Sequence, residues 1–199
     1  LLDQKTKKAF LVRDNFGQKP LYFSIKKNFL CFASELKAIK KHPKIKFKIN
    51  KFSINHFLNY SYISAPDTVY MDVNQLEPGS YLKLSYDELN YFDENQQFQN
   101  QKILSYKRWW TPKREKNFIK NKEDNLNTYS NLLFSSMDQF MQSDVSVGTF
   151  LSGGLDSSIV TALAKKYNDQ VESFTTVYLP QEKYKKFNLD YSFAKRIAN

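Results

Sequence analysis

A short string at residues 152–158 has the side chains and the spacing that suit the binding of an anion. It reads Ser-Gly-Gly-Leu-Asp-Ser-Ser, follows an apolar run at 145–151 and opens a helical pattern at 156–167. The first amides of a helix have no partners within it, and the helix dipole favours negative charge beside them. Two glycines let the backbone approach such an anion, and the serine hydroxyls add donors. The string therefore predicts a bound anion, such as a polyphosphate, at the junction of strand and helix.

Asp156 stands among these donors, and its carboxylate indicates a metal ion beside the anion. Mg²⁺ takes oxygen ligands and is commonly held by one or two carboxylates together with phosphates, so we interpret Asp156 as a magnesium ligand. Ser-Gly-Gly by itself would indicate only an ordinary turn before a capped helix. The string is not a Walker A loop, because no Gly-Lys-Ser/Thr follows, and Phe150 stands where a nucleophile elbow needs glycine.

The second half of the chain has the pattern of an α/β domain that would present this string. An amphipathic helix is predicted from apolar residues three and four positions apart, namely Leu126, Tyr129, Leu133, Met137 and Phe140. Asn121 is its expected N-cap. Strands are predicted at 145–151 and 171–178, and further helices at 156–167 and 190–199. This alternation predicts a parallel sheet, and such sheets bind ligands at the carboxyl ends of their strands.

The first half has the pattern of β structure with two short helices. We predict β structure at 9–34 with a hairpin turn at 26–28, strands at 44–49 and 81–84, and helices at 35–41 and 52–60. Ser34 is the expected N-cap of the first helix, and Gly17 and Pro78-Gly79 are expected in turns. From residue 87 the composition is polar without a clear period, which predicts a long connection at 87–120. Trp109 and Trp110 within it should pack against a domain edge.

Composition excludes several classes of protein. Of the 199 residues, 41% are hydrophobic and 16% aromatic, which is enough for a packed core, and no run reaches the ~18 apolar residues of a membrane span. The first fifty residues hold thirteen Lys and Arg against three Asp and Glu, which equals the whole net charge of +10. These cations stand singly or in pairs, which favours a solvated face over nucleic-acid binding. The single cysteine, Cys31, fits a reducing cytoplasm and a place in the core.

The string at 152–158 is similar to the pyrophosphate loop of the ATP-pyrophosphatase group. Its flanks, Asp-Val-Ser-Val-Gly at 144–148 and Glu-Ser-Phe-Thr at 172–175, resemble the glutamine-hydrolysing asparagine synthetases in particular. Three segments of the first half resemble the end of that family's glutaminase domain. They are 13–22 (Arg-Asp-Asn-Phe-Gly-Gln-Lys-Pro-Leu-Tyr), 32–38 (Phe-Ala-Ser-Glu-Leu-Lys-Ala) and 76–81 (Leu-Glu-Pro-Gly-Ser-Tyr).

The resemblance implies two domains, both incomplete. They are an α+β glutaminase of the Ntn type at 1–86 and, after a linker at 87–120, an α/β parallel-sheet ATP-pyrophosphatase domain (adenine nucleotide α-hydrolase-like) at 121–199. It implies that aspartate, glutamine and ATP become asparagine through β-aspartyl-AMP, with Mg²⁺ as cofactor and AMP and pyrophosphate released. The implied partners are these small molecules in the cytoplasm, without nucleic acid or a membrane. The implied contacts to ATP and pyrophosphate are Phe150, Leu151, Ser152, Gly153, Gly154, Leu155, Asp156, Ser157, Ser158 and Thr176.

Other functions stay open on the sequence alone. A related enzyme could amidate another carboxylate or close a ring, as β-lactam synthetase does. A non-catalytic nucleotide-binding remnant would also keep the loop, and a nucleic-acid-binding module rests on charge alone. We expect the chain to be an internal fragment, because Leu1 stands in place of an initiator methionine.

The 199-residue chain by itself should hydrolyse glutamine only at the background rate. The resemblance assigns the nucleophile to an amino-terminal cysteine, and Leu1 stands first here. Release of glutamate from glutamine, measured against a blank without protein, tests this expectation. Clear turnover by the isolated chain would contradict it.

Overall fold

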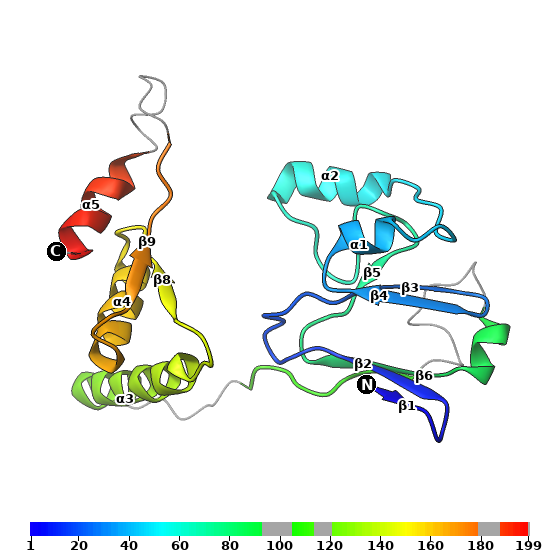
Figure 1. Ribbon diagram of the computed structural model, residues 1–199, viewed down its shortest axis with the longest axis horizontal. Coiled ribbons are helices and arrows are strands. Elements are labelled where there is room, and N and C mark those ends of the chain that lie inside the picture. Colours follow the sequence, from blue (N-terminus) through cyan, green and yellow to red (C-terminus); the bar gives the residue numbers. More distant parts are fainter. Residues whose placement is uncertain (93–104, 114–120, 179–187, 199) are drawn as a thin grey trace. The chain divides into compact units, whose positions relative to one another are not determined.

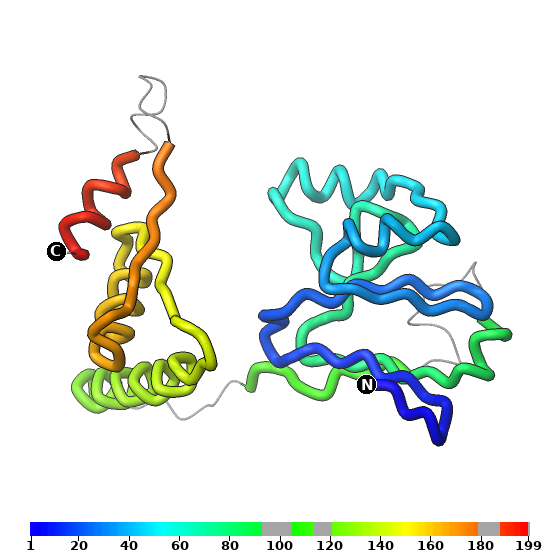
Figure 2. Tube along the Cα trace, viewed as in Figure 1, coloured from blue at the N-terminus to red at the C-terminus, as the bar shows by residue number. Residues whose placement is uncertain are grey.

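The computed structural model describes residues 1–92, 105–113, 121–178 and 188–198, and it divides into two compact units. The first unit is Leu1–Arg114 and the second is Glu115–Asn199. Figure 1 shows their helices and strands, and Figure 2 follows the course of the chain through them. Each unit has a hydrophobic core of its own.

Two antiparallel sheets form the first unit. One sheet has the order β1 (Leu2–Asp3), β2 (Lys8–Val12), β6 (Ser80–Ser85) and β7 (Ser105–Arg108), and the other has the order β4 (Phe29–Ala33), β3 (Tyr22–Lys26) and β5 (Asn74–Gln75). In Figure 1 the β3–β4 hairpin lies over β2 and β6. Buried and half-buried residues alternate along β6, so one face of that strand lies against the core.

The main core of this unit lies between the two sheets. Leu11 on β2 and Leu82 and Leu84 on β6 pack with Phe23 and Ile25 on β3. Each of these side chains is nearly fully buried. Because both sheets contribute inward-facing residues at alternate positions, the unit is a β-sandwich stabilised by burial of apolar surface.

A second core packs helix α1 (Leu36–Lys40) onto the other face of the β3–β4 hairpin. Its buried members are Ile39, Ile45 and Val73. Tyr22 and Cys31 pack against them from β3 and β4, at positions that alternate with the residues of the main core. Helix α2 (Lys51–Tyr60) follows, and the side chain of its N-cap Asn50 accepts two backbone amides of the first turn.

Most of the elements predicted for the first half are confirmed. Strands β2, β3 and β4 occupy the region at 9–34, and Asn28 has a φ of 60° in the hairpin turn. Gly17 and Gly79 have φ values of 65° and 62°, which a glycine adopts without steric cost. The helix predicted at 52–60 is α2, and the strand at 81–84 is β6.

Two local predictions for this half are wrong. Ser34 is not an N-cap, because α1 begins one residue later, after Glu35, and has no side-chain cap. Residues 44–49 form no strand, since a single isolated bridge joins Ile49 to Tyr70. The alternation there has another cause: Ile45 points into the second core while the lysines stay exposed.

The polar stretch after residue 86 contains more structure than a linker. A 3₁₀ helix, η1 (Asp87–Tyr91), buries Leu89 in the main core, and β7 pairs with β6. The amide of Trp109 donates to the carbonyl of Gly79 at 2.8 Å. Trp110 packs edge-on against Phe16, with 5.0 Å between ring centroids. The first unit therefore extends beyond the predicted boundary at 86, because β7 finds its partner far back in the sequence.

The second unit has the predicted order of helices and strands. It contains α3 (Lys122–Met141), β8 (Gly148–Phe150), α4 (Leu155–Tyr167), β9 (Glu172–Phe174) and α5 (Leu189–Ala198). Strands β8 and β9 are parallel, as the alternation predicted. Asn121 caps α3, since its side chain accepts the amide of Glu123 at 3.0 Å. A buried cluster of this unit contains Met137, Leu163 and Ala164.

The apolar stripe of α3 is only partly used within this unit. Met137 is buried and Leu133 packs beside it, but Leu126, Tyr129 and Phe140 are more than half exposed. The spacing thus predicted the helix correctly and overestimated the buried face.

No helix in the described part of the chain combines the length and the apolar character required to cross a membrane.

Two buried hydroxyls provide a matched test of this fold. The Ser53 hydroxyl is buried without a hydrogen-bond partner, whereas the buried Thr68 hydroxyl contacts the carbonyl of Val73 at 2.7 Å and the amide of Tyr70 at 3.1 Å. Ser53→Ala should raise the free energy of unfolding by about 0.5–1 kcal/mol, because alanine favours the helix and leaves no unpaired hydroxyl. Thr68→Val should lower it by about 1–3 kcal/mol. Urea denaturation measures both, and an equal loss in both variants would contradict the assignment.

Candidate functional site

The string at 152–158 lies at the carboxyl end of β8, where the chain turns into α4 (Figure 1). In the parallel pair Gly148 is opposite Glu172 and Phe150 is opposite Phe174, so both strands end at the same edge. The strand, turn and helix predicted around the string are therefore present in the expected order. This edge is where parallel sheets present ligands to loops and helix N-termini.

The first residue of the turn is held on both sides by the segment at the end of β9. Leu151 is buried, and its amide donates to the carbonyl of Phe174 at 2.9 Å. Its carbonyl accepts the hydroxyl of Thr175 at 2.6 Å. With both backbone groups of Leu151 satisfied, the turn starts from a fixed position.

Serine hydroxyls brace the turn from within. Ser152 Oγ lies 3.0 Å from Ser157 Oγ, and the Ser152 amide donates to Ser157 Oγ at 3.3 Å. The Gly154 amide in turn approaches Ser152 Oγ at 3.4 Å. The Ser158 hydroxyl donates to the Gly154 carbonyl at 2.6 Å, so its hydrogen is directed to the helix backbone. The Ser157 hydroxyl also donates to this carbonyl, at 3.1 Å, so Ser157 faces Ser152 across the turn and, together with Ser158, stabilises the first turn of α4.

The two glycines have different roles. Gly153 has a φ of 80°, and a Cβ there would lie 2.6 Å from Phe193 Cβ and 2.7 Å from the Ala194 amide nitrogen on α5. Gly154 has a φ of −74°, and the nearest atom to a Cβ at that position is Ser152 Oγ at 3.5 Å. Gly153 therefore allows the turn and the close approach of α5, whereas Gly154 leaves open space above the start of α4.

Three amides at the start of α4 lack an acceptor in the described part of the chain. The Ser158 amide bonds to Gly154, but the amides of Leu155, Asp156 and Ser157 have no acceptor among the described residues. The side chains of Leu155 and Asp156 are exposed. Unpaired amides and the positive end of the helix dipole make this an electropositive point in open space. The arrangement fits a phosphate group.

The same residues also fit a magnesium ion, provided that phosphate supplies part of its coordination. Asp156 lies in the first turn of α4 with an exposed carboxylate. Among the residues that the structure describes, no group of three or more His, Cys, Asp and Glu side chains could hold a metal. Asp156 would then supply a carboxylate, since Mg²⁺ is commonly held by one or two carboxylates with phosphate oxygens.

The remaining predicted contacts lie along the same edge. Phe150 is 85% exposed and stands opposite Phe174, whose side chain is also exposed. The ring of Phe174 lies so close to Gly148 that a Cβ there would be 2.6 Å from it. Thr176 is exposed two residues after β9. The Phe174 ring thus lies toward the start of β8, and Phe150 is the exposed aromatic residue next to the turn. An exposed aromatic ring is suited to a flat, apolar group such as a nucleobase.

Two residues that matter for this geometry were absent from the predicted set. Thr175 holds Leu151, as described, and Thr149 Oγ1 lies 3.0 Å from Thr161 Oγ1 on α4. The sequence contains a signal for the second contact: Thr149 and Thr161 occupy otherwise apolar positions, one in a buried strand and one in the helix that follows it. Hydroxyls at such positions require partners, so each pointed to a specific contact.

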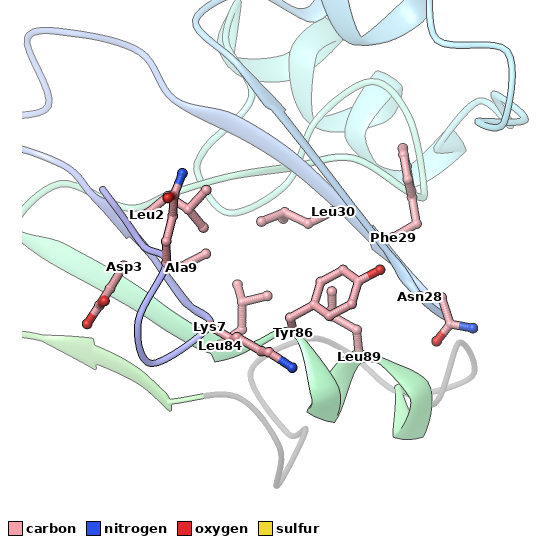
Figure 3. A pocket seen from close by; sticks show the side chains of 11 residues that line it. Leu2, Asp3, Lys7, Ala9, Asn28, Phe29, Leu30, Leu84, Tyr86 and Leu89 are labelled. Atoms are coloured by element: carbon pink, nitrogen blue, oxygen red, sulfur yellow. The ribbon is translucent and has the colours of Figure 1, made fainter.

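The first unit contains a cavity. The cavity of about 470 Å³ opens between β1, the β3–β4 hairpin and η1 (Figure 3). Its lining is mainly apolar, with Leu2, Ala9, Phe29, Leu30, Leu84 and Leu89. Cys31 faces the second core instead, and burial raises the pKa of its thiol. A protonated, partly buried thiol is a poor nucleophile.

The glycine pair provides a direct test of this geometry. Gly153→Ala should lower the free energy of unfolding by about 1–3 kcal/mol, because its φ is strained for alanine and Phe193 occupies the space. Gly154→Ala should cost less than about 1 kcal/mol, because its backbone conformation suits any residue. Thermal denaturation of both variants measures the difference. Similar losses would mean that α5 does not pack on Gly153.

Known proteins match both units in the same order along the chain. Residues 1–98 match the glutamine amidotransferase domain family, and residues 128–199 match the asparagine synthase family. Asparagine synthetase [glutamine-hydrolyzing] 3 of Bacillus subtilis (strain 168) is 28% identical over 188 residues, covering 92% of this chain and 28% of the relative. A putative asparagine synthetase [glutamine-hydrolyzing] of Mycobacterium tuberculosis (strain ATCC 25618 / H37Rv) is 29% identical over 181 residues, covering 88% and 26%.

An archaeal relative extends the same pattern. Putative asparagine synthetase [glutamine-hydrolyzing] 2 of Methanocaldococcus jannaschii is 31% identical over 171 residues, covering 85% of this chain and 30% of the relative. The chain thus spans 26% to 30% of the length of these three curated relatives. The asparagine synthase match includes the string at 152–158 and its flanks, and the glutamine amidotransferase match includes the segments at 13–22, 32–38 and 76–81. The chain therefore belongs to the family of glutamine-hydrolysing asparagine synthetases.

Proposed function

We propose that this chain serves the ATP-dependent synthesis of asparagine from aspartate, with glutamine as the nitrogen donor. The observation that carries the proposal is the turn at the end of β8, followed at the start of α4 by three amides that no described residue accepts. The matches to both domain families support the two half-reactions, glutamine hydrolysis and amide synthesis. The small-molecule substrates would be used in the cytoplasm, without nucleic acid or a membrane.

In the proposed reaction the β-carboxylate of aspartate attacks the α-phosphorus of ATP. The bond between the α-phosphorus and the bridging oxygen breaks, so β-aspartyl-AMP forms and pyrophosphate leaves. Ammonia released from glutamine then attacks the acyl carbon, AMP departs, and asparagine results. ATP supplies the activation of the carboxylate in this scheme. The charge that grows on the pyrophosphate is the one that the protein must stabilise.

The residues of the turn are placed to stabilise that charge. The amides of Leu155, Asp156 and Ser157 would donate to pyrophosphate oxygens, and the Ser152 hydroxyl would add a further donor. Asp156 would hold Mg²⁺ together with those oxygens. Because Leu151 and the serine hydroxyls fix the turn before any ligand arrives, little reorganisation is needed when the charge develops.

The adenosine would lie beside the turn along the same edge. Phe150 and Thr176 flank the ends of β8 and β9, and both are exposed. Cys31 is not a candidate for the glutaminase nucleophile, because it packs in the second core with a raised pKa. The proposal therefore assigns ATP to the second unit and leaves glutamine hydrolysis to a residue other than Cys31.

Asp156→Ala tests the proposed metal role in the glutamine-hydrolysing enzyme that contains this chain. Loss of the carboxylate should lower asparagine formation by roughly 10²-fold or more, because metal-bound pyrophosphate would lose its anchor. Glutaminase activity should stay unchanged, since the turn belongs to the other unit. Asparagine and glutamate are measured in parallel, with aspartate required for release of pyrophosphate.

Asp138→Ala is the matched control, because Asp138 is an exposed acid on α3 of the same unit. It should leave both activities at the level of the unaltered enzyme. Retained asparagine synthesis in Asp156→Ala would remove Asp156 from the metal role. Release of pyrophosphate that depends on another carboxylate, and not on aspartate, would contradict the proposed substrate.

A further inference from the structure

A hydroxyl pair outside the predicted phosphate contacts joins β8 to α4. Thr149 Oγ1 and Thr161 Oγ1 lie 3.0 Å apart. Thr149 is the middle residue of β8 and is nearly fully buried, two residues before the anchored Leu151. Thr161 is in the middle of α4, between one and two turns after the amides at the start of that helix. The pair thus spans the strand before the turn and the helix after it.

This contact constrains α4 in a way that its apolar contacts do not. Leu163 and Ala164 are buried against Met137 of α3, and Ile159 packs beside them. Such contacts gain energy from buried area and have no fixed direction, so they tolerate small sliding of a helix. A hydrogen bond loses its strength within a few tenths of an ångström and with misalignment. The threonine pair therefore favours one position of α4 along β8.

Sliding of α4 would move the unpaired amides by the same distance, because a helix behaves as a rigid rod over so short a length. The other end of the turn is already held at Leu151 by Phe174 and Thr175. The turn consequently lies between two fixed points, one on β9 and one on α4. The distance between the end of β8 and the start of α4 therefore depends on both contacts.

We propose that Thr149 and Thr161 are positioning residues that set the distance between the start of α4 and the end of β8, and hence the affinity for the phosphates of ATP. This inference rests on the proposed ATP-binding role of the turn. Stability alone does not require the pair, because replacing both partners of a buried hydrogen bond with apolar groups of the same shape is often close to neutral. Valine has the shape of threonine without the hydroxyl, so the two roles separate experimentally.

The test uses Thr149→Val, Thr161→Val and the double variant in the glutamine-hydrolysing enzyme that contains this chain. Each single variant leaves one hydroxyl without its partner and should lower the melting temperature. The double variant should regain most of that loss. Its KM for ATP should nevertheless stay about three- to tenfold above that of the unaltered enzyme, with kcat changed less, because the amides are no longer held at one distance.

Two further variants sharpen the result. Thr161→Ser keeps the hydroxyl and should leave the KM for ATP at the level of the unaltered enzyme. Thr128→Val removes an exposed hydroxyl from α3 by the same substitution and should change neither the melting temperature nor the KM for ATP. A double variant with recovered stability and an unaltered KM for ATP would overturn the inference. An unaltered enzyme that neither binds nor consumes ATP would instead overturn the proposed function, so the two failures are distinguishable.

Discussion

The amides at the start of α4 are the constraint on which the second unit depends. Leu155, Asp156 and Ser157 present donors that no described residue accepts, at the positive end of a helix dipole. Such a point is useful to an anion only if its position is fixed. The surrounding contacts supply that position: Leu151 is bound on both sides by the end of β9, and the Ser152 and Ser157 hydroxyls meet across the turn.

The same turn also determines how closely α5 can pack against it. Gly153 adopts a conformation that favours glycine, and the backbone of α5 approaches it so closely that no side chain fits between them. Gly154 has no such neighbour and borders open space. A single Gly-Gly pair thus meets two different demands, one from the packing of α5 and one from access to the amides. The packing of α5 and the open space before the amides thus fall to two neighbouring residues.

In the first unit a buried guanidinium holds a turn in place. Arg13 donates to the carbonyls of Lys19, Leu76 and Gly17, at 3.1, 2.5 and 2.8 Å. The Asp14 carboxylate accepts backbone amides of the same turn, that of Gln18 among them, which lowers its pKa. The Arg-Asp string that resembles the glutaminase domains is therefore explained by architecture. It secures a turn between β2 and β3 and the segment that leads into β6.

Local sequence determined the features that depend on neighbouring residues alone. Turns at Gly17 and Gly79, the cap at Asn121 and the order of strand, turn and helix around 152–158 follow from backbone sterics and periodicity. Tertiary structure decided which segments meet. Strand β7 exists because β6 accepts it, and 44–49 is no strand because Ile45 and Phe47 pack in the second core with α1. The contacts of Thr149 and Thr175 likewise required the fold, because a hydroxyl finds its partner in space and not in sequence.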